Sequence, residues 1–138
     1  MGNASSDGEF TAMELAVIGQ WLANRGSYGE YQFISPETFE EMRPKPTSQA
    51  TIAGEHGLGL HHIRHRRSGT STNPSEPNDL LFSKNTFGHG SFSGCTLVVD
   101  PDQQLVIVQA RKQFHQQDNE YWTRFFQVVA DSIKKDKE

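Results

Sequence analysis

Cysteine is almost absent from this sequence, and long apolar runs are absent altogether. The 138 residues include one cysteine, Cys95, which excludes an internal disulfide. No apolar run approaches the length of a membrane span, and the chain opens without the charged and then apolar segment of a secretion signal. We therefore expect no membrane partner, and the cellular localisation stays unknown.

Basic residues are fewer than acidic residues in this sequence. Thirteen Lys and Arg residues face 17 Asp and Glu residues, which gives a net charge of −4. Because an acidic surface repels phosphates, we predict no nucleic-acid partner. His61, His62 and His65 lie in a short basic stretch, but no cysteine or carboxylate there completes a tetrahedral ligand set. We therefore predict no metal site and no cofactor.

Capping residues announce two helices in the first third of the chain. Thr11 and Glu14 can form a capping box, and Gly26 can end that helix in the left-handed conformation. Ser35 followed by Pro36 predicts a second, short helix that ends near residue 42, before two further prolines. Apolar residues at helical spacing predict a third helix near the C-terminus: Trp122, Phe125, Phe126, Val129 and Ile133.

The middle of the chain predicts strands. Alternation over residues 58–63 favours a half-buried strand, and the polar stretch 68–84 reads as a long surface loop. Two β-branched, apolar runs flank Asp100-Pro101 and predict a hairpin. We therefore expect a single α+β domain over residues 1–138, with an antiparallel sheet of three to four strands and the C-terminal helix packed on one face.

The segment that enters this hairpin has an unusual composition for a strand. Within "TFGHGSFSGC", three glycines and three hydroxyl residues accompany one histidine, whereas strands favour Val and Ile. Glycine inside a strand often marks a place where a ligand or another backbone approaches closely. This segment is therefore the leading candidate for a functional site.

Three stretches follow one another in the chain: "DGEFTAMELAVIGQWLANRGSYGEYQFISPETFEEM", "GLGL" and "FGHGSFSGCTLVVDPDQQLVIV". In this order they resemble the C-terminal part of the serine β-lactamase and penicillin-binding-protein superfamily, especially its class C and esterase-like branch. The resemblance implies that the chain is the C-terminal segment of a longer β-lactamase-like serine hydrolase, which transfers an acyl group from an ester, amide or β-lactam to water.

The resemblance also assigns catalytic residues. The third signature of the family, usually Lys-Thr-Gly on an edge strand, would be His89-Gly90-Ser91, and the backbone N–H of Phe92 would be an oxyanion-hole donor. The partner implied is a small-molecule or peptide acyl substrate that pairs with this strand. His89 stands in place of lysine, so its charge would depend on pH. Ser91 stands in place of glycine, and its side chain would crowd the substrate.

The nucleophile of the family has no convincing counterpart. Ser132 to Lys135 match S-x-x-K formally, but at the end of a helix, where lysine is expected as a solvated partner of the helix dipole. We treat this match as chance and expect the chain to be inactive alone. The alternative is a non-catalytic interaction module with the same sheet. An incomplete sheet would leave apolar surface exposed, which predicts a weak homo-oligomer.

Overall fold

The computed structural model describes residues 10–44, 57, 59–67, 80–91, 94–111 and 118–135, and the structural statements below concern these residues. They form the following elements in chain order: α1 (Ala12–Ala23), β1 (Ser27–Tyr28), β2 (Tyr31–Gln32), α2 (Pro36–Met42), β3 (His61–His62), β4 (Phe87–Gly90), β5 (Thr96–Asp100), β6 (Leu105–Gln109) and α3 (Asp118–Lys135).

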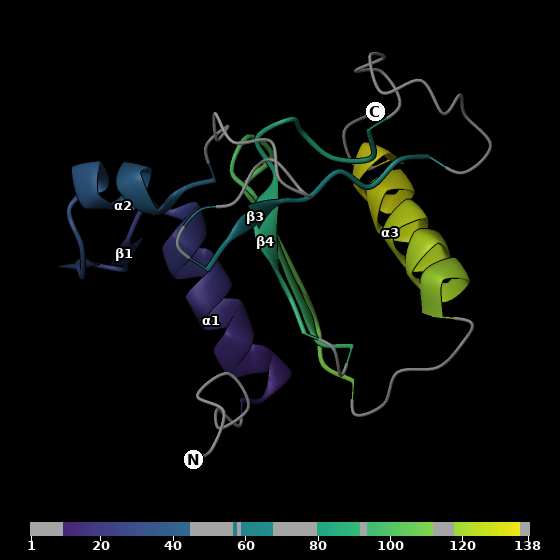
Figure 1. The fold of residues 1–138 in the computed structure, drawn as a ribbon, viewed down its shortest axis with the longest axis horizontal. Helices are drawn as coiled ribbons and strands as arrows, with labels where there is room; N and C mark the ends of the chain where they lie inside the picture. Colours follow the sequence, from purple (N-terminus) through teal and green to yellow (C-terminus); the bar gives the residue numbers. More distant parts are fainter. Residues whose placement is uncertain are drawn as a thin grey trace.

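The main sheet has four antiparallel strands in the order β3-β4-β5-β6, and β1 and β2 form a separate hairpin. Figure 1 shows the strands of the main sheet between α1 and α3, so a helix covers each face. This arrangement confirms the predicted α+β class and the C-terminal helix on one face of an antiparallel sheet. No helix in the described ranges is both long and apolar enough to cross a membrane.

Both predicted helix caps are present. The hydroxyl of Thr11 accepts a hydrogen bond from the backbone N–H of Glu14 (3.2 Å), and the Glu14 carboxylate accepts one from the backbone N–H of Thr11 (2.8 Å). Gly26 has the predicted positive φ of +87°, but the first left-handed residue after α1 is Arg25 (φ +54°), whose N–H donates to the Leu22 carbonyl (3.2 Å). At α2, the Ser35 hydroxyl accepts from the backbone N–H of Thr38 (3.2 Å).

The core on the α1 face joins the helix directly to the strands. Its buried side chains come from α1, α2, the turn before β3, and the central strands: Leu22, Phe39, Leu60, Phe87, Leu97 and Val99. A Cβ added to Gly19 of α1 would lie 2.3 Å from Val106 Cγ1 and 2.8 Å from Leu97 Cδ1. Glycine at this position therefore allows α1 to lie against β5 and β6.

The core on the α3 face contains two residues that the sequence analysis placed in a surface loop. Leu81 and Phe82 are buried there with Val98, Ile107, Phe126 and Ala130. The prediction of a continuous surface loop over residues 68–84 is therefore wrong at its end. The prediction followed the polar residues before Leu81 and gave too little weight to the two apolar side chains. Leu and Phe are among the residues most often buried in folded proteins.

β3 is shorter than the predicted strand. Gly59 has a φ of +77°, and the backbone N–H of Gly57 donates to the Leu60 carbonyl (2.7 Å), so a turn precedes His61. Strand geometry is incompatible with that left-handed conformation, and the observed strand is only His61–His62.

The hairpin between β5 and β6 is organised around a buried carboxylate. Asp100 is fully buried and accepts hydrogen bonds from the backbone N–H groups of Ser83 (2.8 Å), Asp102 (3.1 Å) and Gln103 (3.1 Å). Burial raises the pKa of this carboxyl, but the bonds from Ser83 and Gln103 outweigh burial, and the pKa lies below its usual range. The Asp100 carboxylate thus holds the residues before β4 to the β5–β6 turn.

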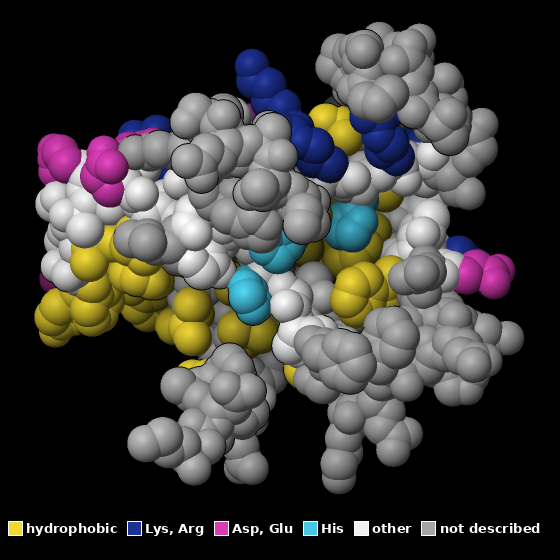
Figure 2. Space-filling model, viewed as in Figure 1, with side chains coloured by type: hydrophobic (Ala, Val, Ile, Leu, Met, Phe, Trp, Pro, Cys, Tyr) yellow, Lys and Arg dark blue, Asp and Glu magenta, His cyan; other side chains and the backbone are white. Residues whose placement is uncertain are grey.

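Exposed apolar side chains collect on α1 and around the β1–β2 hairpin. In this region the exposed fractions are 75 % for Met13, 74 % for Tyr31, 65 % for Phe33 and 59 % for Phe10. In Figure 2, hydrophobic side chains gather along the left flank of the molecule, where Figure 1 places β1. A surface of this kind favours association, and the weak homo-oligomer stays a prediction.

Candidate functional site

The candidate site lies where β4 passes from the core to the surface. Phe87 and Gly88 are buried, whereas His89 and Gly90 are exposed. All four residues pair with β5, in the register Phe87↔Val99 to Gly90↔Thr96. The exposed end of β4 therefore remains a regular strand, supported on one side by the central strand of the sheet.

The other edge of β4 is only partly covered. In the described part of the chain, β3 pairs with Phe87 and Gly88 and with no later residue of β4. The backbone N–H of Ser91 donates to the Cys95 carbonyl (2.9 Å), toward the β5 side. Because backbone groups of successive strand residues point alternately to the two edges, those of Gly90 point away from β5. Gly90 therefore presents strand backbone to the outer edge beyond β3.

His89 is held by a residue far away in the sequence. Its Nδ1 lies 2.9 Å from the carbonyl oxygen of Gly59, in the turn before β3. The rings of His61 and His89 lie edge to face, with 5.9 Å between their centroids. These contacts fix the direction of an otherwise exposed side chain.

Ser91 follows β4 and closes the connection to β5. Its hydroxyl accepts a hydrogen bond from the backbone N–H of Cys95 (3.1 Å), and its carbonyl accepts one from the N–H of Gly94 (3.0 Å). The hydroxyl is therefore engaged with the start of β5, and the expectation that this side chain crowds the substrate stays a prediction. Phe92, the predicted oxyanion donor, lies outside the described residues.

The two glycines of β4 have different surroundings. A Cβ added to Gly88 would lie 2.0 Å from the Leu97 carbonyl oxygen and 2.8 Å from Ile63 Cδ1, whereas one added to Gly90 would meet nothing closer than 3.7 Å, the Thr96 hydroxyl. Gly88 therefore makes room for the sheet itself. Only Gly90 leaves the strand thin where its edge is open.

A small hollow adjoins this end of β4, with a volume of about 220 Å³. Figure 2 shows histidine side chains close to one another near the centre of the face in view, with Lys and Arg side chains beside them. The described residues that line the hollow are His61, His62, Ile63, Arg64, His65, His89, Gly90, Thr96 and Trp122. None of them is Asp or Glu. Its walls therefore suit an electron-rich group such as a carbonyl or carboxylate better than a cation.

Within the described part of the chain, the histidines of this hollow are not arranged as a metal site. No group of three or more His, Cys, Asp or Glu side chains in the described ranges is arranged to hold a metal ion. The His65 ring stacks on Phe126, with 4.0 Å between centroids, and desolvation lowers its pKa to about 4. His65 is therefore a neutral part of the α3 core at physiological pH.

Two other potential nucleophiles are engaged in local hydrogen bonds. The Cys95 thiol donates to the carbonyl of Arg111 (3.3 Å). The Ser132 hydroxyl donates to the carbonyl of Val128 (2.8 Å), one turn earlier in α3. Neither side chain lines the hollow beside β4.

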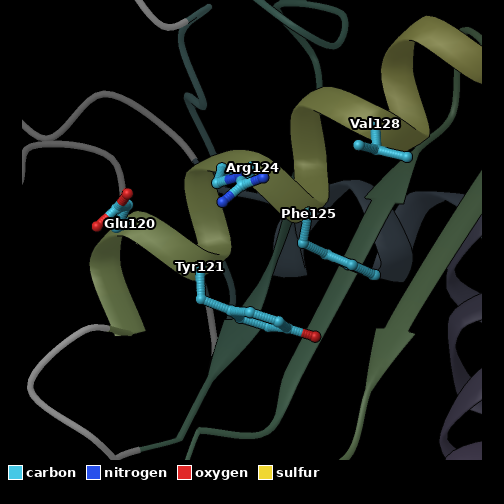
Figure 3. A pocket seen from close by; sticks show the side chains of 5 residues that line it. All are labelled: Glu120, Tyr121, Arg124, Phe125 and Val128. Carbon is cyan, nitrogen blue, oxygen red and sulfur yellow. The ribbon is translucent and has the colours of Figure 1, made fainter.

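A larger hollow, of about 580 Å³, lies on α3. Figure 3 shows its lining, Glu120, Tyr121, Arg124, Phe125 and Val128, all from this one helix, with Tyr121 and Phe125 side by side. Their rings are nearly parallel, with 6.3 Å between centroids. The lining residues include no pair of nucleophile and base, so this surface is a weaker candidate than the end of β4.

The structure brings together two site residues that the sequence analysis predicted, His89 and Gly90, and adds two that it missed. Gly59 and His61 contact His89 from β3 and its preceding turn. The only signal for them in the sequence was the alternation over residues 58–63, which predicted a strand. This alternation does not show which other strand the predicted strand pairs with.

Comparisons with known proteins concern the family and the fold of the chain. No family model matches the chain. A protein of Escherichia coli O157:H7 with the provisional name D-alanyl-D-alanine carboxypeptidase is 30% identical over 102 residues, 74% of this chain and 21% of that protein. The protein of the same name from Escherichia coli K12 is 29% identical over the same length. The chain thus spans about a fifth of the length of the curated relatives that it matches.

A solved structure has a similar fold. A β-lactamase from Mycobacterium bovis superposes with a TM-score of 0.57 at 19% identity, over 91% of this chain and 44% of that one. At this identity the likeness concerns the fold, which is that of a β-lactamase.

Proposed function

Since the chain belongs to the serine β-lactamase and penicillin-binding-protein superfamily, we propose that it is the C-terminal segment of a longer serine hydrolase. In this proposal it supplies the edge strand along which an acyl substrate lies. The reaction is the transfer of an acyl group from an ester, amide or β-lactam to water. The single observation that carries the proposal is the edge of β4 at Gly90, which no strand of the described ranges covers, beside an exposed, oriented His89.

The backbone has the first role in this proposal. An extended acyl group pairs with the outward N–H and C=O of Gly90, as a peptide adds to the edge of a sheet. From the family resemblance we propose in addition that the backbone N–H of Phe92, which lies outside the described residues, donates to the oxyanion that develops on the substrate carbonyl.

His89 has the second role. Its ring adjoins the hollow beside β4, within reach of a substrate that pairs with Gly90. There it hydrogen-bonds to the substrate or to the nucleophile's partner. Attack on the acyl carbonyl requires a serine paired with a base, and we propose that both come from the part of the longer protein that this chain lacks.

The first test uses the isolated chain. It should hydrolyse neither nitrocefin nor short p-nitrophenyl esters above the rate without protein, because it lacks the serine and lysine pair. Turnover that disappears in Ser132→Ala would mean that the terminal S-x-x-K is functional, and turnover that persists would point to another nucleophile.

The second test uses the longer protein that contains this chain. His89→Ala should lower kcat/KM by roughly 100-fold, the effect of removing one positioned acid, base or oxyanion donor. The melting temperature is the control, because an exposed histidine contributes little to stability. Wild-type kcat/KM in folded His89→Ala would end the assignment of His89-Gly90-Ser91, and a longer protein without hydrolase activity would favour an interaction module.

A further inference from the structure

The hydrogen bond of His89 identifies which ring nitrogen carries the proton. Nδ1 lies 2.9 Å from the carbonyl oxygen of Gly59. A carbonyl oxygen only accepts hydrogen bonds, so Nδ1 must be the donor. In the neutral imidazole one nitrogen is a donor and the other an acceptor. When the ring is neutral, the contact therefore selects the Nδ1–H tautomer and leaves a lone pair on Nε2.

The backbone of Gly59, whose carbonyl accepts this bond, has a conformation that favours glycine. The φ of Gly59 is +77°, which residues with a side chain rarely adopt. A Cβ added there would meet no atom within 4 Å, so the backbone, and not a lack of space, accounts for glycine at this position. The turn is closed by the hydrogen bond from the Gly57 N–H to the Leu60 carbonyl (2.7 Å).

The sheet fixes this turn relative to His89. β3 pairs with β4 in the register His61↔Gly88, so the residues just before β3 lie beside the residue that follows Gly88. The His61 ring also contacts the His89 ring. Two contacts from the same segment therefore restrain the imidazole.

We propose that Gly59 is a positioning residue, whose carbonyl holds neutral His89 as the Nδ1–H tautomer and makes Nε2 a hydrogen-bond acceptor at the open end of β4. A lysine in this position carries only donors. His89 instead accepts a hydrogen bond from a hydroxyl or N–H group of the substrate or nucleophile. This role of Nε2 toward a substrate or nucleophile rests on the proposed function. The assignment of the tautomer rests only on the contact with Gly59.

The test is nuclear magnetic resonance of the 138-residue chain with ¹⁵N-labelled histidine. Two-bond and three-bond correlations between ring protons and ring nitrogens distinguish the tautomers, in mildly alkaline solution where an ordinary imidazole is neutral. The loss of one set of signals in His89→Gln assigns His89. We expect a protonated Nδ1 and an unprotonated Nε2 in the wild-type chain.

Three variants test the part of Gly59. Gly59→Ala disfavours the positive φ and should shift His89 toward the Nε2–H form that predominates in free histidine. Gly59→Asn should restore the Nδ1–H form, because asparagine tolerates this conformation better than alanine does. Gly29→Ala is the matched control, since Gly29 also has a positive φ (+59°) and open space around it, but lies in the β1–β2 turn.

The wild-type spectrum alone can overturn the proposal. A His89 that is mainly protonated at Nε2 in the wild-type chain contradicts it, even if Gly59→Ala does not fold. An unchanged Nδ1–H tautomer in folded Gly59→Ala contradicts the role of Gly59. These spectra require no hydrolase activity, so failure of the proposed function in the longer protein would be seen separately.

Discussion

The two halves of β4 belong to one strand but have opposite surroundings. Phe87 and Gly88 are buried and pair with both neighbouring strands, whereas His89 and Gly90 are exposed and, among the described residues, pair with β5 alone. Both halves carry a glycine, for different reasons. Gly88 lets β4 approach the carbonyl of Leu97, while Gly90 leaves an accessible strand edge without a side chain.

The comparison shows that a glycine-rich strand is not by itself evidence of a ligand site. The same composition serves packing in one half and accessibility in the other, and only the neighbouring atoms distinguish them. The predictions below test this division, first in the buried half and its supports and last at the exposed end.

The largest effect is expected for Gly88→Ala. Its Cβ would lie 2.0 Å from a backbone oxygen that cannot move without breaking the β4–β5 pairing. The free energy of unfolding should fall by about 3 kcal/mol or more, measured by urea denaturation. Gly90→Ala is the matched control, and it should change that free energy by less than about 1 kcal/mol. Equal losses in both variants would remove the difference between the two halves.

The next effect concerns pH and the contrast between a buried and an exposed histidine. The pKa of His65 is lowered to about 4 by burial. The unfolded chain therefore binds a proton near pH 6.5 that the folded chain binds only near pH 4, so stability is complete above the unfolded pKa and falls as the pH drops between these values. Over this pH range His65 lowers the free energy of unfolding by roughly 3 kcal/mol. His65→Phe should flatten this part of the pH profile, and an unaltered profile would contradict a neutral, buried ring.

A smaller effect is expected when the anchor before β4 is weakened. Asp100→Asn replaces an oxygen that accepts N–H hydrogen bonds with an NH₂ group that cannot accept them. The free energy of unfolding should fall by about 2 kcal/mol. Asp102→Asn is the control, because Asp102 is exposed and accepts its hydrogen bond from the Asn85 side chain (3.0 Å). A loss at Asp102 as large as at Asp100 would show that burial of the Asp100 carboxylate is not the cause.

The smallest effect on stability is expected at the exposed end. His89→Ala removes one solvent-exposed hydrogen bond to Gly59. The free energy of unfolding should change by less than about 0.5 kcal/mol. A loss of several times that amount would mean that His89 holds the β3 turn in place, and that its role is chiefly structural.

The sequence predicted the parts of the fold that depend on neighbouring residues. The N-terminal caps of α1 and α2 and the turn after Asp100 were predicted correctly, because each depends on a few consecutive residues. The positive φ of Gly26 was also predicted, but the helix already turns left-handed at Arg25. The β1–β2 hairpin was missed because its strands have two residues each. The burial of Leu81 and Phe82 was missed because it depends on α3, which comes much later in the chain.

The same distinction applies to the candidate site. Composition and family resemblance were enough to select His89 and Gly90, which the structure places at the exposed end of a strand. The bond to Gly59 joins residues thirty positions apart, and no local pattern predicts which carbonyl a histidine will meet. The orientation of Ser91 also depends on the return of the chain at Cys95.

The division of the core into two layers also separates the two tryptophans of the chain. Trp21 packs on the α1 layer and Trp122 on the α3 layer, with the sheet between the helices. Indole emission responds to its immediate environment, so each layer contains its own intrinsic fluorophore. A single fluorescence transition shared by both would show that the layers are lost together, and two transitions would show that one helix leaves the sheet before the other.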